Sequence, residues 1–148
     1  MSDKTEATCR CGQVRVAING APAITAACHC TGCQAMTASA FSLGVMYHQA
    51  AVNIEGDTVL GGLKGESQHH CCANCLSWMY TKARAFGPMI TIHSSALAEF
   101  DEQPPFMEVC TDEKLSWVNL GAAHSFARFP PPDQFSRLLA EFGASRRT

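Results

Sequence analysis

Cys72-Ala73-Asn74-Cys75 is followed at once by an apolar run that predicts a strand over 77–81. A second pair, in Cys9-Arg10-Cys11-Gly12, likewise precedes alternating apolar residues. Cysteine pairs on turns that lead into strands are typical of zinc ribbons, where four thiolates close a tetrahedral structural site. The sequence therefore predicts one structural zinc on Cys9, Cys11, Cys72 and Cys75. That zinc would close a loop of about 60 residues, which is entropically costly without a clip.

Cys71 competes with its neighbour for a place in this set. Cys72 and Cys75 have the usual spacing of two intervening residues, whereas Cys71 and Cys75 do not. We therefore expect Cys72 to be the ligand and Cys71 to lie beside the site.

A second cluster, Cys28-His29-Cys30-Thr31-Gly32-Cys33, holds three thiols within one short segment. In an extended chain Cys28 and Cys30 point to one side and His29 to the other. Cys33 can rejoin them because Gly32 lets the backbone turn. Three protein ligands with one open position are the arrangement of catalytic zinc. Inert thiols, redox thiols and a purely structural zinc remain alternatives for this cluster.

The remaining titratable groups give weaker signals. His29 could be a fourth ligand, a proton shuttle or a hydrogen-bonding neighbour of the ligands. His69 and His70 precede the third cysteine motif and could contact either site. Cys110 stands alone in the sequence, and we expect it to be a buried, inert thiol.

Composition limits the class of protein. The chain has 148 residues, of which 47% are hydrophobic and 16% charged, as expected for one globular domain. The net charge of −2 argues against a nucleic-acid partner. No apolar run is long enough to cross a membrane, and residues 1–8 lack an apolar signal region. Nine cysteines, an odd number, favour metal ligands in a reducing compartment over a disulfide framework, so we expect a cytoplasmic protein.

Short alternating runs predict a mainly β domain. The C-terminal end differs, because Phe135, Leu138, Leu139 and Phe142 share one face of a helix. Asp133 is a suitable first residue for that helix and Gly143 a suitable stop, which predicts a helix over 133–142. A short helix is expected over 32–39, and strands are expected over 14–18, 41–47, 51–54, 58–60, 77–81, 89–93 and 107–111.

The order Cys-x-Cys-Gly, Cys-His-Cys-x-x-Cys, Cys-x-x-Cys resembles the glutathione-dependent formaldehyde-activating family, which includes the centromere-protein-V-like proteins. The resemblance runs from about Cys9 to Trp117. It implies a β-tent fold of several small, coiled antiparallel sheets in a single domain over 1–148, with its core at about 8–120. It implies two zinc ions per chain, one structural and one catalytic, on the two cysteine sets above. It also implies a carbon–sulfur lyase that joins glutathione and formaldehyde.

Some positions depart from the family pattern. His69 and Gln34 stand where arginines are usual, and Leu76 stands where glycine is usual. Basic residues are natural partners for the carboxylates of glutathione. We therefore expect a small thiol or aldehyde substrate, with glutathione not the best thiol. His29 is the expected catalytic proton carrier. The alternative function is a non-catalytic zinc-stabilised binding or scaffold protein of the same fold.

Overall fold

The structure, a computed structural model, describes every residue from Met1 to Thr148. Its contacts group into two compact units, although the sequence predicts a single domain. Unit 1 combines Met1–Pro22 with Gly44–Asp101, and unit 2 combines Ala23–Leu43 with Glu102–Thr148. The chain is mainly β, with 36% strand and 23% helix, as predicted.

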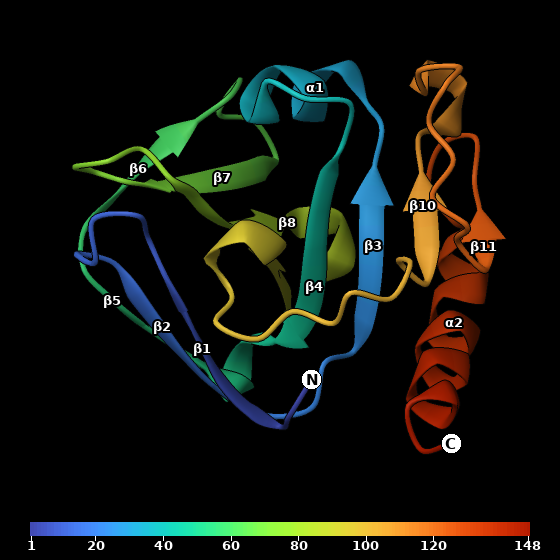
Figure 1. Cartoon of the computed structure of the whole chain (residues 1–148), viewed down its shortest axis with the longest axis horizontal. Helices are drawn as coiled ribbons and strands as arrows, with labels where there is room; N and C mark the ends of the chain where they lie inside the picture. The colour runs from blue at the N-terminus through green and yellow to red at the C-terminus, as the bar shows by residue number, and fades with distance from the viewer. The chain divides into compact units, whose positions relative to one another are not determined.

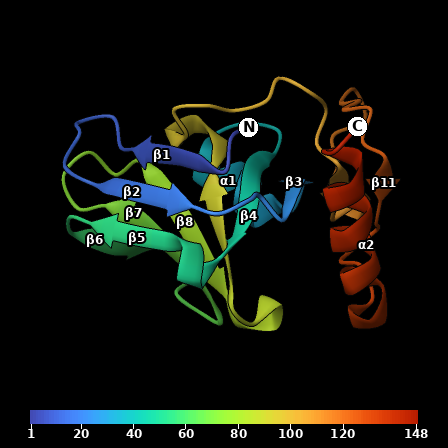
Figure 2. The same cartoon turned by 90° about the horizontal axis from the view of Figure 1, so that it is seen from below.

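Unit 1 begins with a three-stranded antiparallel sheet in the order β1-β2-β5. Its strands are β1 (Lys4–Thr8), β2 (Arg15–Asn19) and β5 (Val52–Glu55), which lie side by side in Figure 1 and Figure 2. The apolar residues that alternate along β2, Val16 and Ile18, are both buried. The alternation that predicted this strand therefore marks its core face.

The other strands of unit 1 form a run of antiparallel neighbours. From Gly44 onward β4 pairs with β9, which pairs with β8, then β7, then β6. A shared core of buried residues includes Cys9 and Cys72, so two of the predicted metal ligands are anchored in it. The bounds are β4 (Ser42–His48), β6 (Thr58–Gly61), β7 (Ser67–Cys72), β8 (Trp78–Ala83) and β9 (Met89–His93). Three short 3₁₀ turns, Gln49–Ala51, Arg84–Phe86 and Ser94–Ala96, connect strands in this unit.

Unit 2 is built on parallel pairs. Its central strand, β10 (Met107–Val109), pairs in parallel with β3 (Ile24–Cys28) and with β11 (His124–Ser125). Helix α1 (Thr31–Thr37) follows β3, and a 3₁₀ turn, Thr111–Glu113, follows β10. The C-terminal helix α2 (Pro132–Ser145) lies beside β11 in Figure 1. It buries Leu138 and Phe142, which lie on the predicted apolar face.

Each predicted helix and strand corresponds to an observed element, but the sequence pattern did not predict β1, β3, β7 and β11. Two predicted ends also differ from the structure. Strand β10 ends at Val109, since Cys110 turns into a left-handed conformation with φ 56°. Helix α2 does not stop at Gly143 but continues to Ser145, so the predicted stop is wrong. The residue after the helix, Arg146, still has a right-handed backbone. No helix of the structure is both long enough and apolar enough to cross a membrane.

Replacing Gly143 with Ala should stabilise the protein, because a glycine inside a helix costs about 0.5–1 kcal/mol relative to alanine. A Cβ built at Gly143 meets no atom within 4 Å, so no clash offsets this gain. We expect the midpoint of urea unfolding to rise at an unchanged slope. A lower midpoint would show that Gly143 ends the helix, as the sequence pattern predicts.

Candidate metal centres

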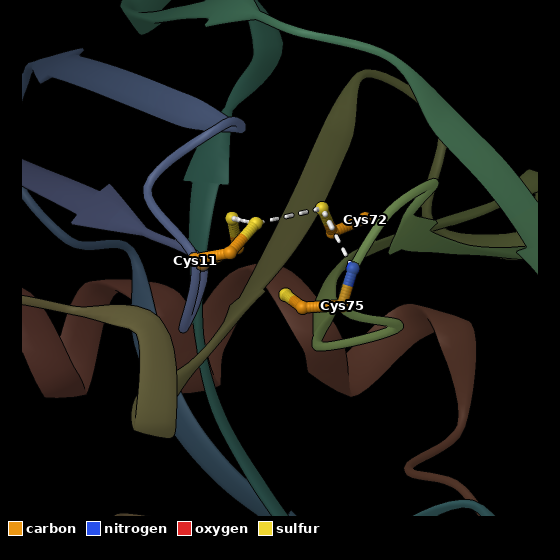
Figure 3. A group of neighbouring side chains, drawn as sticks. Cys11, Cys72 and Cys75 are labelled. Carbon is orange, nitrogen blue, oxygen red and sulfur yellow. Dashed lines mark hydrogen bonds between the residues drawn. The ribbon is translucent and has the colours of Figure 1, made fainter.

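Four cysteines of unit 1 meet where two turns face each other. Cys9 follows β1 and Cys72 ends β7, and each is followed by its partner in a tight turn. The sulfur atoms of Cys9, Cys11, Cys72 and Cys75 all lie within 4.8 Å of one another. Figure 3 shows the side chains of Cys11, Cys72 and Cys75 pointing toward one another. The structure thus brings together the set predicted from spacing, and Cys71 lies outside it.

Backbone N–H groups in both turns donate to these sulfurs. Val14 N lies 3.2 Å from the Cys9 sulfur, and Asn74 N lies 3.4 Å from the Cys72 sulfur. Ser77 links the two turns, because its hydroxyl accepts from Arg10 N (3.2 Å) and donates to the Cys75 sulfur (3.1 Å). Such donors favour thiolates over thiols.

The pKa values of this set move in opposite directions. Hydrogen bonds from the side chain and backbone of Ser77 lower the pKa of Cys75 to about 5. The backbone N–H of Cys75 lowers the pKa of Cys72, but burial and the neighbouring thiols outweigh it and raise the pKa to about 11. One thiolate therefore hinders the next from ionising. A bound cation relieves this repulsion, and thiolates are soft ligands, so the donor set fits a thiophilic metal.

The turn after Cys75 needs a left-handed residue. Leu76 has φ 60°, and its N–H donates to the Cys72 carbonyl at 3.0 Å. Glycine adopts this conformation freely, whereas another residue loses roughly 1–2 kcal/mol. Leu76, the residue at the family's glycine position, therefore keeps the turn geometry at a cost in stability.

The second cluster lies in unit 2, between β3 and α1. Cys28 ends β3, Cys30 caps α1, and Cys33 lies in the first turn of that helix. Their three sulfurs also lie within 4.8 Å of one another. The Cys30 sulfur accepts a hydrogen bond from Cys33 N at 3.3 Å, which fixes the cap. The cluster supplies three sulfur ligands, and no further His, Cys, Asp or Glu side chain meets the same distance limit.

Gln34 and Glu113 hold the second cluster in place. The Gln34 amide donates to the carbonyls of His29 (2.8 Å) and Glu113 (3.1 Å). The Glu113 carboxylate accepts from the N–H of Thr31 (3.3 Å) and from its hydroxyl (3.0 Å). Gln34, at a position where the family usually has arginine, thus contributes to the local structure of this segment.

His29 is fully buried next to a carboxylate of β10. Its Nε2 lies 2.8 Å from Glu108 Oε2, and its Nδ1 has no hydrogen-bond partner. Glu108 also accepts from the Ser125 hydroxyl (2.7 Å) and from Lys114 Nζ (3.1 and 3.2 Å). Burial alone would raise the pKa of Glu108, but these three partners hold it below its usual value. Glu108 is therefore ionised, and the proton between the two side chains belongs on His29 Nε2.

Sequence reasoning missed the neighbourhood of Cys110. Val109 lies opposite Cys28 in the parallel pairing of β10 with β3, which brings the next residue, Cys110, beside it. Burial, followed by the Cys28 and Cys30 thiols, raises the pKa of Cys110 to about 12. No local spacing in the sequence predicts that these residues are neighbours, because β3 and β10 are far apart in the chain.

None of the other histidines joins a cysteine cluster, and four of the five lie in unit 1, the exception being His124 in unit 2. His69 Nδ1 and His93 Nε2 each lie 3.0 Å from the Thr81 hydroxyl, which also accepts from Trp78 Nε1 at 3.2 Å. His70 stacks on Tyr80 with ring centroids 4.5 Å apart. These side chains connect neighbouring strands by polar and ring contacts.

The two cysteine clusters agree with a known family pattern. The pattern of the family described as glutathione-dependent formaldehyde-activating enzyme matches residues 4–113. The chain belongs to this family. The matched range contains both cysteine clusters and Cys110, whereas α2 lies beyond it.

One solved structure shows the same fold. It is a crystal structure of a Rhodobacter sphaeroides protein from the Northeast Structural Genomics effort, with a TM-score of 0.52 and 15% identity. The similarity covers 66% of this chain and 91% of that one. At this identity the likeness concerns the fold alone. No curated protein matches the chain significantly.

Cys72→Ala should lower the melting temperature by about 10 °C or more. For a chain of this length, that corresponds to a loss of ~3 kcal/mol in the free energy of unfolding. The reason is that the binding energy of a structural metal is folding energy. Cys71→Ala removes a buried thiol outside the cluster and should cost only about 1 kcal/mol. Thermal melts of the metal-loaded variants compare the two. A larger loss in Cys71→Ala would contradict the ligand assignment.

Proposed function

We propose that this protein is a zinc-dependent carbon–sulfur lyase that acts on a thiol or thiohemiacetal at the three-cysteine centre. One observation carries the proposal: three thiols of unit 2 converge within 4.8 Å, without a fourth donor in the set. Zinc bound by three protein ligands keeps an open position for a substrate, whereas four ligands close the site. The Cys9, Cys11, Cys72, Cys75 centre is then structural and the Cys28, Cys30, Cys33 centre reactive.

Zinc is the metal proposed for both centres, because all seven ligands are thiolates and zinc accepts them in tetrahedral geometry. When bound at the second centre, it would supply Lewis acidity for a thiol or a carbonyl oxygen. The chain's own part is to hold three sulfurs on a capped helix start, so that the site is formed before substrate arrives.

The reaction needs one proton transfer. When a thiol adds to an aldehyde, a sulfur–carbon bond forms, the carbonyl π bond opens, and the thiol proton goes to the carbonyl oxygen. His29 lies between two of the ligands, and Glu108 fixes its ring with the proton on Nε2. Its Nδ1 is therefore the nitrogen proposed to accept and return the proton.

The contacts of unit 2 support a thiol other than glutathione. Lys114 is bound to Glu108, and Arg128 lies 2.8 Å from Glu113 and 3.3 Å from Asp112. Both cations are already paired with carboxylates of the same unit, which weakens them as anchors for the carboxylates of glutathione. All nine cysteines are unpaired, which suits a reducing, cytoplasmic setting.

The zinc-loaded protein should accelerate thiohemiacetal formation from formaldehyde and a panel of thiols, with glutathione not the preferred one. Cys28→Ser should abolish the acceleration and lower the zinc content from two to one per chain. Cys71→Ser is the matched control, because Cys71 belongs to neither cluster. No rate above the uncatalysed reaction with any thiol would favour the scaffold alternative, and a selective rate with glutathione would contradict the substrate proposal.

His29→Asn should lower turnover by roughly 10²–10⁴, the usual contribution of general acid–base catalysis. Zinc content should stay at two per chain, because His29 is not among the sulfur ligands. Measuring turnover and zinc content on the same preparation separates the roles. Unchanged turnover would remove His29 from the reaction, whereas loss of the second zinc would make it part of the metal site.

A further inference from the structure

We propose that Cys28 and Cys110 form a redox pair, in which oxidation to a disulfide removes Cys28 from the three-cysteine metal set. The pair is distinct from the family's ligand sets, because Cys110 belongs to neither cluster. The inference rests on the second centre being a metal site, as proposed above. It does not require that the centre turns over a substrate.

The parallel pairing of β3 and β10 places the two residues together. Cys28 lies opposite Val109, so Cys110 is one position further along the neighbouring strand. One step of register between adjacent strands corresponds to a Cα separation of about 6 Å, within the range that disulfides span. The Cys28 thiol is also near enough to help raise the pKa of Cys110.

Hydrogen bonds on both sides fix the backbone of Cys110. Its N–H donates to the Arg128 carbonyl at 2.8 Å, and its own carbonyl accepts from Glu113 N at 3.1 Å. Its left-handed backbone, with φ 56°, is unusual for a residue other than glycine. Strained conformations of this kind persist where the surroundings over-determine them, often at functional sites.

The two thiols differ in access. Cys28 is partly exposed, whereas Cys110 is completely buried. An oxidant in solution therefore reaches Cys28 more easily than Cys110. The buried Cys110 thiol would react only with the oxidised sulfur of Cys28 beside it. As a metal ligand Cys28 would be a thiolate. A partly accessible thiolate next to a resolving cysteine is the usual arrangement of reversible thiol oxidation.

The chemistry balances with a hydroperoxide as the oxidant. The Cys28 thiolate attacks the peroxide, its O–O bond breaks, and a sulfenic acid forms as the other oxygen leaves as hydroxide or alkoxide. The Cys110 sulfur then attacks the sulfenic sulfur, a sulfur–sulfur bond forms, and water leaves with the Cys110 proton. Cys110 is the natural partner, because Cys30 and Cys33 are engaged as ligands while it is not. Only two thiols then remain for the metal.

The experiment exposes the zinc-loaded protein to hydrogen peroxide and follows zinc with a chromogenic chelator. Trypsin then gives separate peptides, because Val16–Lys64 contains Cys28, Cys30 and Cys33, whereas Ala85–Lys114 contains only Cys110. We expect release of one zinc per chain together with a disulfide between these two peptides. Reductant and fresh zinc should restore two zinc ions per chain.

Variants test the assignment. The cross-link should be absent in Cys28→Ser and in Cys110→Ser and present in the control Cys71→Ser. In the Cys110→Ser variant no resolving thiol is present, so Cys28 should be oxidised further to the sulfinic acid. Reductant should then no longer restore the second zinc. A disulfide confined to Val16–Lys64 or equal recovery in Cys110→Ser would overturn the proposal. If the cross-link forms on oxidation but the reduced, zinc-loaded protein shows no turnover with any thiol, the redox pair stands and only the proposed lyase activity is refuted.

Discussion

The crowding of sulfur atoms in unit 1 is the constraint on which that unit depends. Four thiols share a space in which every sulfur is within 4.8 Å of the others, and neighbouring thiolates repel one another. A cation bound among them relieves this repulsion. Because Cys9 and Cys72 are also core residues, a cation bound to the four sulfurs would hold the turn after β1 against the turn after β7. Metal binding and core packing would then stabilise each other.

Features encoded in short spacings could be predicted from the sequence. Cys72 and Cys75 are close because one tight turn separates them, and Cys28, Cys30 and Cys33 are close because a strand ends where a helix begins. The choice of Cys72 over Cys71 depends on the same local geometry. Gly143 shows the limit of this reasoning, since glycine ends a helix only where the chain leaves the right-handed conformation. Helix α2 keeps the right-handed conformation through Gly143, and the presence of a glycine in the sequence does not show whether the chain leaves that conformation.

Contacts between distant strands could not be predicted in this way. Strand β10 reaches β3 by parallel pairing, and the Glu108–His29 contact joins residues 79 positions apart. Periodicity identifies a strand but carries no information about its partner. The sequence therefore gives no signal for Glu108, and it predicts Cys110 only as a buried, inert thiol. His29 remains a prediction as a proton carrier, although its carboxylate partner is now identified.

Strand β10 offers a way to change chemistry without changing a metal ligand. Glu108 contacts His29, and Cys110 follows Val109, which is paired with Cys28, so one residue of this short strand and the residue just after it lie beside two adjacent residues of the second cysteine cluster. Groups that hold or hydrogen-bond the neighbours of a ligand tune metal affinity and reactivity nearly as much as the ligands do. The cysteine motifs specify where metal could bind, and β10 supplies the groups that would tune the second cluster.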